Sequence, residues 1–219
     1  MIFDKKEFNI ENLDAVLFDF DGVLAESMNV KTDAFKKLFE KFGEDIVKKV
    51  VKHHIENGGI SRYKKIEYYY SEYLKNPITS EEVNKIADRF SELVVDTVVT
   101  SAWVKGAEGF LKKYYKNNDF FVISGTPQKE LELIIKKRNM KKYFVEVYGT
   151  PATKPELINK IIDEKNYSRN KVLYIGDSLS DYNAAKETKI LFLGRVESGK
   201  KSDFPKNVKV INTFLDIMF

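Results

Sequence analysis

Four short polar motifs carry residue types that can do chemistry, and each lies after an apolar run or at the start of a helical one. Asp19 and Asp21 follow the first apolar run, Ser124 follows a second, and residues 176–181, which include two aspartates, follow another. Lys154 begins a helical stretch between them. In open α/β sheets, ligands bind outside the carboxyl ends of the strands. We therefore expect the four motifs to meet in one pocket.

The carboxylates among these residues suit metal-assisted attack on phosphorus. Asp19 and Asp177 offer hard oxygen ligands of the kind that Mg²⁺ prefers. A carboxylate such as Asp19 can also attack a phosphoryl group and form an aspartyl-phosphate. Asp21, two residues further along, is placed to protonate a leaving alcohol and later to activate water.

The remaining polar groups suit the phosphoryl group itself. Lys154 supplies positive charge, while Ser124 and the backbone N–H groups near Gly125 supply hydrogen-bond donors. Each motif alone also has an ordinary interpretation, as a turn, a helix cap or an acidic helix N-terminus. The ordered set, with its members beside strands, favours the chemical interpretation.

The elements that would position these motifs are visible as apolar patterns. Short, mostly continuous apolar runs predict buried parallel strands at residues 15–18, 120–123, 145–148, 172–175, 190–193 and 208–211. Helical patterns separate the later runs, at residues 128–138, 156–165 and 178–187. This alternation predicts an α/β fold with a doubly wound parallel sheet.

A segment with helical patterns and no convincing strand interrupts this alternation. Helices are predicted at residues 32–42, 45–57, 61–74 and 80–99, with glycines or an Asn-Pro pair between them. We therefore expect two domains. Residues 1–26 and 101–219 would form the catalytic core, and residues 27–100 would form an inserted all-helical domain.

Composition and charge exclude several classes of protein. The 219 residues are 43% hydrophobic and 32% charged, which is typical of a globular chain with a well-buried core. The chain has no cysteine, which excludes disulfides, thiolate zinc sites and cysteine nucleophiles. The net charge of +4 comes without a dense basic stripe, so we expect no nucleic-acid partner. The sequence shows no signal-peptide pattern and no membrane-length apolar run, so we expect a cytoplasmic protein without a membrane partner.

Taken together, the motifs resemble those of the haloacid dehalogenase (HAD) superfamily of phosphotransferases, and the resemblance covers nearly the whole chain. The four family motifs correspond to residues 19–24, 122–126, 154–155 and 176–181. The resemblance implies a Rossmann-like core with a helical cap inserted after the first motif. Such a cap closes over the site, excludes water and contributes to specificity.

The resemblance also implies a role for each matched residue. Asp19 is the nucleophile, and Asp21 is the general acid and base. Asp181 supports the site from behind the metal ligands. Mg²⁺ would be held by Asp19, the Asp21 backbone carbonyl and Asp177. The phosphoryl group would be held by Ser124, Gly125 and Lys154.

The second aspartate and the helical segment refine the activity. Dehalogenases of this superfamily lack an acidic residue at the position of Asp21 and bind no magnesium, whereas phosphatases and phosphomutases have one. Residues 59–62 resemble a Gly-x-Ser-Arg motif of β-phosphoglucomutase, which implies that Arg62 contacts an anionic part of the substrate. A histidine of that mutase is replaced here by Lys31, which disfavours mutase activity. Arg62, Lys31 and His54 are thus candidate substrate contacts, with ordinary surface or packing roles as the alternative.

The sequence therefore predicts a Mg²⁺-dependent phosphatase that hydrolyses a small phosphomonoester through an aspartyl-phosphate. Residues 28–32 and 58–63 resemble phosphatases found near surface-polysaccharide genes, which points to a sugar, polyol or amino-alcohol phosphate. A β-phosphoglucomutase-like phosphomutase and a phosphoglycolate phosphatase are the alternatives. A domain that binds a phosphoester without turnover is a further, non-enzymatic one.

Overall fold

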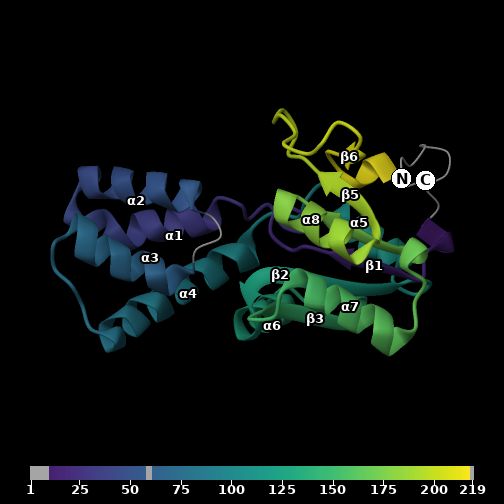
Figure 1. Cartoon of the computed structure of the whole chain (residues 1–219), viewed down its shortest axis with the longest axis horizontal. Helices are drawn as coiled ribbons and strands as arrows, with labels where there is room; N and C mark the ends of the chain where they lie inside the picture. The colour runs from purple at the N-terminus through teal and green to yellow at the C-terminus, as the bar shows by residue number, and fades with distance from the viewer. Residues whose placement is uncertain (1–9, 58–60, 218–219) are drawn as a thin grey trace. The chain divides into compact units, whose positions relative to one another are not determined.

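The computed structural model describes residues 10–57 and 61–217 and divides into two compact units (Figure 1). The core unit comprises residues 1–26 and 101–219, and the helical unit comprises residues 27–100. None of the helices within residues 10–57 and 61–217 is long and apolar enough to cross a bilayer.

The core unit contains a six-stranded parallel sheet with the strand order β3-β2-β1-β4-β5-β6. The strands are β1 (Ala15–Phe18), β2 (Asp119–Pro127), β3 (Glu146–Thr150), β4 (Val172–Gly176), β5 (Leu191–Arg195) and β6 (Val210–Ile211). Strand β1 lies between β2 and β4, and all four of its residues are buried because side chains cover both faces of the sheet. This arrangement confirms the predicted α/β fold.

Helices pack on both faces of this sheet. The helices of the core unit are α5 (Ala107–Tyr114), α6 (Gln128–Lys137), α7 (Lys154–Lys165) and α8 (Leu179–Thr188). Ala15 and Leu17 join the apolar side chains of α7 and α8 in one core cluster. Successive strand residues point to opposite faces, so Phe18 lies on the other face. There its ring meets Phe110 of α5, with ring centroids 6.1 Å apart.

The helical unit is built from α1 (Val30–Phe39), α2 (Glu44–Glu56), α3 (Arg62–Tyr68) and α4 (Ser80–Thr100). A π-helical turn, η3 (Tyr69–Tyr73), follows α3. Aromatic rings form the centre of this unit. Phe35 of α1 lies 4.5 Å from Phe90 of α4, and Phe39 lies 5.4 Å from the fully buried Tyr69. These contacts join α1, α4 and η3, each of which turns an apolar face toward the others.

Several elements differ from the sequence prediction at their ends. Strand β2 continues to Pro127, whereas the motif that begins at Ser124 was expected to follow the strand as a turn. The register between β2 and β3 shifts between Ile123 and Pro127, so the strand becomes irregular there without ending. Helix α5 was not predicted, because its eight residues include Gly109 and follow closely on α4. Strand β6 is limited to Val210–Ile211.

An aromatic cluster lies between α5 and the face of the sheet that carries Phe18. Phe110 is fully buried, and its ring lies 5.0 to 6.1 Å from those of Tyr114, Phe214, Phe120 and Phe18. We expect Phe110→Ala to lower the free energy of unfolding by about 3–5 kcal/mol, because it removes buried contacts and leaves a cavity. Urea denaturation followed by circular dichroism measures this loss. Lys112→Ala on the exposed side of α5 is the control, with an expected change below about 0.5 kcal/mol; equal midpoints for the two variants would contradict the prediction.

Candidate active site

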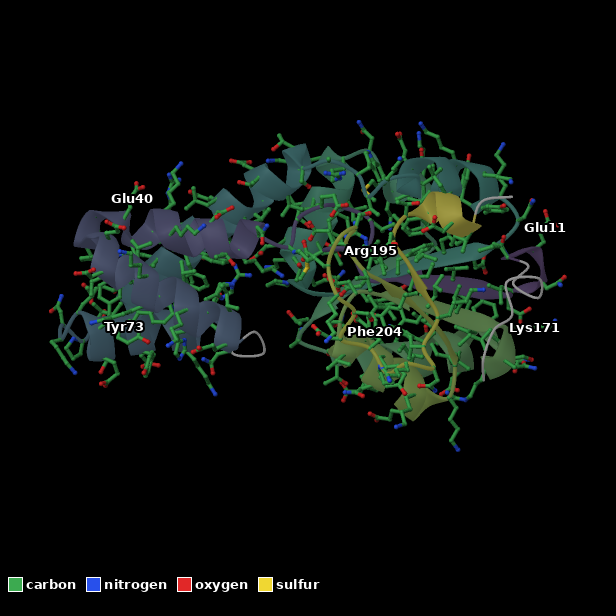
Figure 2. The ribbon with its side chains drawn as sticks, turned by 90° about the horizontal axis from the view of Figure 1, so that it is seen from above. Glu11, Glu40, Tyr73, Lys171, Arg195 and Phe204 are labelled. Carbon is green, nitrogen blue, oxygen red and sulfur yellow. The ribbon has the colours of Figure 1, made fainter. Side chains whose placement is uncertain are left out.

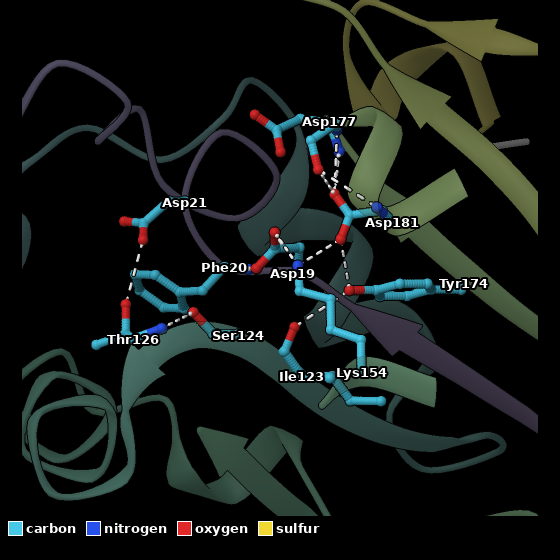
Figure 3. Close-up of polar contacts among 11 residues, drawn as sticks. Asp19, Phe20, Asp21, Ile123, Ser124, Thr126, Lys154, Tyr174, Asp177 and Asp181 are labelled. Carbon is cyan, nitrogen blue, oxygen red and sulfur yellow. Dashed lines mark hydrogen bonds and ion pairs between the residues drawn. The ribbon is translucent and has the colours of Figure 1, made fainter. Parts of the chain in front are cut away.

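The parallel register brings the polar motifs to one edge of the sheet. Phe18, the last residue of β1, pairs with Val122 of β2 and Ile175 of β4. Asp19 therefore lies one residue beyond this paired level, and Ser124 and Asp177 each lie two residues beyond it on the neighbouring strands. The Asp19 N–H donates to the Ile175 carbonyl at 2.9 Å, which fixes the backbone of this residue to β4. Figure 3 shows the side chains of the core motifs converging there.

Lys154 holds two carboxylates together. It is the first residue of α7, and a capping box formed by Thr153 and Glu156 fixes this helix N-terminus. The Lys154 Nζ lies 2.8 Å from Asp19 Oδ2 and also forms an ion pair with Asp181 Oδ1. Burial alone lowers the pKa of Lys154, but the two carboxylates raise it by more, so its pKa lies above its ordinary value and the ammonium stays charged.

Asp181 is fully buried, and both of its carboxylate oxygens are engaged. Oδ1 accepts hydrogen bonds from Lys154 and, at 2.8 Å, from the Tyr174 hydroxyl. Oδ2 accepts from the N–H groups of Asp177 and Ser178 at 3.2 and 3.0 Å, and from the Ser178 hydroxyl at 2.7 Å. The Asp181 side chain also lies so close to Gly176 that a Cβ there would come within 2.3 Å of it. Asp181 thus orients Lys154 and the β4–α8 turn, which fits a supporting position.

Three buried or half-buried carboxylates lie close enough to share a cation. Ligand atoms of Asp19, Asp177 and Asp181 are all within 4.8 Å of one another. Burial is the main cause that raises the pKa of both Asp19 and Asp177, and the negative charges of their acidic neighbours raise it further. An all-oxygen donor set with excess negative charge fits a hard divalent cation such as Mg²⁺. The two oxygens of Asp181 accept five hydrogen bonds, whereas those of Asp19 accept one each, so Asp19 and Asp177 have more room to bind a cation than Asp181 has.

Asp21 and Ser124 line the neighbouring part of the edge. The Asp21 Oδ2 accepts a hydrogen bond from the Thr126 hydroxyl at 3.3 Å, and the Ser124 hydroxyl accepts one from the Thr126 N–H at 3.1 Å. The Phe20 N–H donates to Asp19 Oδ1 at 2.7 Å. Each oxygen of Asp19 therefore has a donor, Phe20 for one and Lys154 for the other, which fixes the orientation of the carboxylate (Figure 3).

A buried arginine fixes the loop that follows Asp21. Arg195, at the end of β5 and labelled in Figure 2, is 5% exposed. It donates to the Gly22 carbonyl at 3.0 Å. It also forms a two-pronged ion pair with Glu26 at 2.5 and 3.1 Å. Gly22 has a φ of 74°, in the region that favours glycine, and its N–H donates to the Ala25 carbonyl at 2.8 Å. Arg195 therefore stabilises the tight turn that carries Asp21.

The three candidate substrate contacts of the helical segment lie in the helical unit. Lys31 is in α1, His54 is in α2, and Arg62 begins α3. The Arg62 guanidinium donates to the Ser91 hydroxyl at 2.5 Å and lies over the Phe90 ring. His54 packs 4.8 Å from Phe35. Gly59 and Ile60, the first two residues of the Gly-x-Ser-Arg resemblance, lie outside the described residues.

Several residues of the site at the sheet edge and of the helical unit were not singled out from the sequence. Tyr174 reads as one more apolar residue of a strand, and Thr126 as turn material. Arg195 and Glu26 are 169 positions apart, so no local pattern connects them. Lys65 sits in a lysine-rich helix that looks solvent-exposed, yet its side chain is 2% exposed. For Lys65, the one signal in the sequence was its place on the otherwise apolar face of the predicted helix.

Comparison with known proteins is consistent with this fold and motif set. The model of the haloacid dehalogenase-like hydrolase family matches residues 16–194. A search of curated proteins finds none that matches this sequence.

Three solved structures share the fold at low sequence identity. YfnB from Bacillus subtilis, provisionally described as a HAD-hydrolase and bound to magnesium, is 14% identical with a TM-score of 0.73 over 94% of this chain and 97% of its own. A Thermotoga maritima protein provisionally described as a β-phosphoglucomutase is 20% identical, with a TM-score of 0.70 over 91% and 94%. A Haemophilus somnus protein described as a predicted phosphoglycolate phosphatase is 16% identical, with a TM-score of 0.73 over 94% and 96%.

The family match spans the sheet from the first strand to the fifth and includes every polar motif of the edge described above. This chain belongs to the haloacid dehalogenase-like hydrolase family.

Proposed function

We propose that this protein is a Mg²⁺-dependent phosphatase that hydrolyses a small phosphomonoester, with Asp19 as the nucleophile. The observation that carries the proposal is the environment of the Asp19 carboxylate. Lys154 binds one of its oxygens at 2.8 Å, Asp177 lies beside it, and Asp21 follows two residues later. The residues proposed as nucleophile, phosphate-binding cation, metal ligand and acid thus lie at one edge of the sheet.

The residues divide the reaction into two steps. In the first, an oxygen of Asp19 attacks phosphorus, the bond from phosphorus to the ester oxygen breaks, and Asp21 gives its proton to that oxygen. In the second, the Asp21 carboxylate accepts a proton from water, whose oxygen attacks the phosphorus of the aspartyl-phosphate. The bond between phosphorus and Asp19 then breaks, and inorganic phosphate leaves.

Lys154 and Ser124 are proposed to bind the phosphoryl oxygens during both steps, together with the backbone near Gly125. Lys154 is suited to this role because its ammonium is held in place before substrate binds. Asp19, the Asp21 backbone carbonyl and Asp177 would hold the Mg²⁺, whose charge offsets the negative charge that gathers between the carboxylates and the phosphoryl group.

The substrate class follows from the resemblance and from the chemistry of the helical unit. We propose a small phosphorylated metabolite such as a sugar, polyol or amino-alcohol phosphate, with surface-polysaccharide precursors as one source. The helical unit, residues 27–100, is proposed to act as the cap that selects it. Lys31, His54 and Arg62 are its candidate contacts, since they offer positive charge and hydrogen-bond donors to an anionic or hydroxylated compound.

The nucleophile can be tested by a single substitution. We expect Asp19→Asn to lower kcat at least about 10⁴-fold, since a neutral amide does not attack phosphorus. Release of inorganic phosphate from a panel of phosphomonoesters, with Mg²⁺ present, measures the effect. Asp163→Asn, at an exposed position on α7, is the matched control and should keep wild-type activity. Full activity of Asp19→Asn, with a circular dichroism spectrum like that of the wild type, would exclude this nucleophile.

The general acid and base has a distinct signature. We expect Asp21→Asn to lower kcat by about 10²–10⁴-fold for substrates with alcohol leaving groups. With 4-nitrophenyl phosphate, whose leaving group needs no proton, formation of the aspartyl-phosphate should be much less affected. A burst of nitrophenol followed by slow turnover is therefore the expected result. An equal loss of the first and second steps with both substrates would place the acid elsewhere.

Metal dependence and reaction type can be measured together. We expect EDTA to abolish phosphate release and Mg²⁺ to restore it, because Asp19 and Asp177 need a compensating cation before a phosphate dianion can approach. Phosphorus NMR with β-glucose 1-phosphate separates the two reaction types. Free phosphate supports the phosphatase, whereas accumulation of glucose 6-phosphate would support the phosphomutase, the activity named for the similar Thermotoga maritima structure.

A further inference from the structure

Lys65 is a buried cation in the helical unit. It lies on α3, and 2% of its surface is exposed, while its neighbour Lys64 is exposed. Its Nζ lies 2.9 Å from His54 Nδ1 and 3.3 Å from the His54 carbonyl oxygen. These contacts fix the position of the Lys65 ammonium against α2.

The Lys65–His54 contact fixes the proton positions of both groups. An ammonium has donors and no acceptor, so His54 Nδ1 accepts from it and the neutral ring carries its own proton on Nε2. Two of the three ammonium N–H groups are then used by His54. The third N–H of Lys65 and the Nε2–H of His54 have no acceptor among the described residues.

The charges around Lys65 are positive. Burial is the main cause that lowers its pKa to about 8, and the charge of Lys31 lowers it further. Burial likewise lowers the pKa of His54 to about 4, with Lys65 and Lys31 acting in the same direction. Among the described residues, no carboxylate forms an ion pair with Lys65. Lys65 therefore remains mostly protonated at neutral pH, while His54 is neutral.

An aromatic ring compensates part of this charge. The Lys65 Nζ lies 6.0 Å from the centre of the Phe35 ring, at the far limit of a cation–π contact. Such a contact does not replace a counter-ion, because a buried charge that is neither paired nor fully hydrogen-bonded destabilises the fold. A carboxylate or phosphate oxygen would supply both the missing charge and the missing acceptors.

We propose that Lys65, with the Nε2–H of His54 and the positive charge of Lys31, forms an anion-binding site of the helical unit. Its ligand is a carboxylate or a phosphate group of a small molecule. Two sources offer this chemistry: a second anionic group on the phosphatase substrate, or a separate free anion. The first source rests on the proposed function, and the second does not.

Binding can be tested without catalysis, because His53 and His54 are the two histidines of the chain. Carbon-13 labelled histidine in the full-length protein gives two imidazole signals in a proton–carbon spectrum. In EDTA and at constant ionic strength, inorganic phosphate or malonate should shift the His54 signal saturably. The His53 signal should shift less, since that ring contacts Tyr69 and Tyr68 instead.

Matched variants identify the residue responsible. Lys65→Met has a similar length and suits a buried position, and it should abolish the saturable shift. Lys64→Met removes an exposed charge one residue away and should leave the shift intact. If the His54 signal of the wild type does not move with either anion up to tens of millimolar, the proposal is wrong. That result stands whether or not Lys65→Met folds.

Kinetics distinguish the two sources. Matched substrates are 2-phosphoglycolate with ethyl phosphate, and 3-phosphoglycerate with glycerol 3-phosphate. If the anion belongs to the substrate, the charged member should have a kcat/KM about tenfold or more higher, mainly through KM. Lys65→Met should remove this preference while changing the neutral member less than about threefold.

A saturable His54 shift without any such preference assigns the site to a free anion, and inorganic phosphate should then alter hydrolysis in the wild type but not in Lys65→Met. A shift that persists unchanged in Lys65→Met would overturn the assignment to this lysine. Absence of hydrolysis for every phosphomonoester would contradict the proposed phosphatase and leave the spectroscopic result to decide the anion site.

Discussion

The ion pairs that Lys154 forms with Asp19 and Asp181 are the interaction on which the site depends. A lysine with a side chain 16% exposed stands between two carboxylates that come from different turns of the sheet edge. Without it, the negative charges of this edge would repel one another in a region where water screens them poorly. Lys154 is available there because a capping box begins α7 at that residue. A local signal for a helix start thus places the central charge of the site.

Hydrogen bonds to Asp181 and a close approach at Gly176 fix the backbone around these ion pairs. Asp181 lies in the first turn of α8, and its carboxylate binds Lys154 of α7 and Tyr174 of β4. One buried carboxylate therefore connects the β4–α8 turn to α7 and to the sheet. This connection requires Gly176, since any Cβ there would overlap the Asp181 side chain. Residues that crowd like charges destabilise a fold, and the dense hydrogen bonding of Asp181 offsets part of that cost. Asp181 therefore stabilises the site through its hydrogen bonds, which occupy both of its carboxylate oxygens.

The sequence predicts the parts of this structure that local patterns encode. Apolar runs predicted β1, β3, β4 and β5 to within about two residues at each end, and polar residues after such runs or at a helix start pointed to Asp19, Ser124, Lys154 and Asp177 as candidates. Contacts between distant segments were not predictable. Tyr174 binds Asp181 through a hydroxyl that a strand pattern treats as apolar, and Arg195 reaches Glu26 across 169 positions. The extension of β2 through Ser124 and Gly125 was missed as well, because a Ser-Gly-Thr-Pro sequence is typical of turns. The strand is irregular there and pairs with β3 again only at Pro127, which no local pattern predicts.

Both units bury ionisable groups whose pKa values are shifted mainly by burial, acidic groups in the core unit and basic groups in the helical unit. In the core unit, Asp19 and Asp177 are carboxylates whose pKa is raised mainly by burial, and Lys154 compensates part of their charge. In the helical unit, Lys65 and His54 are basic groups whose pKa is lowered mainly by burial. Folding alone favours neither arrangement, since like charges out of water oppose it. A bound ligand would offset this cost: a cation and a phosphoryl group in the function proposed for the core unit, and an anion in the site proposed for the helical unit. In these proposals the chemistry of the reaction and the choice of substrate are encoded in separate units, each by a set of buried polar groups that a ligand completes.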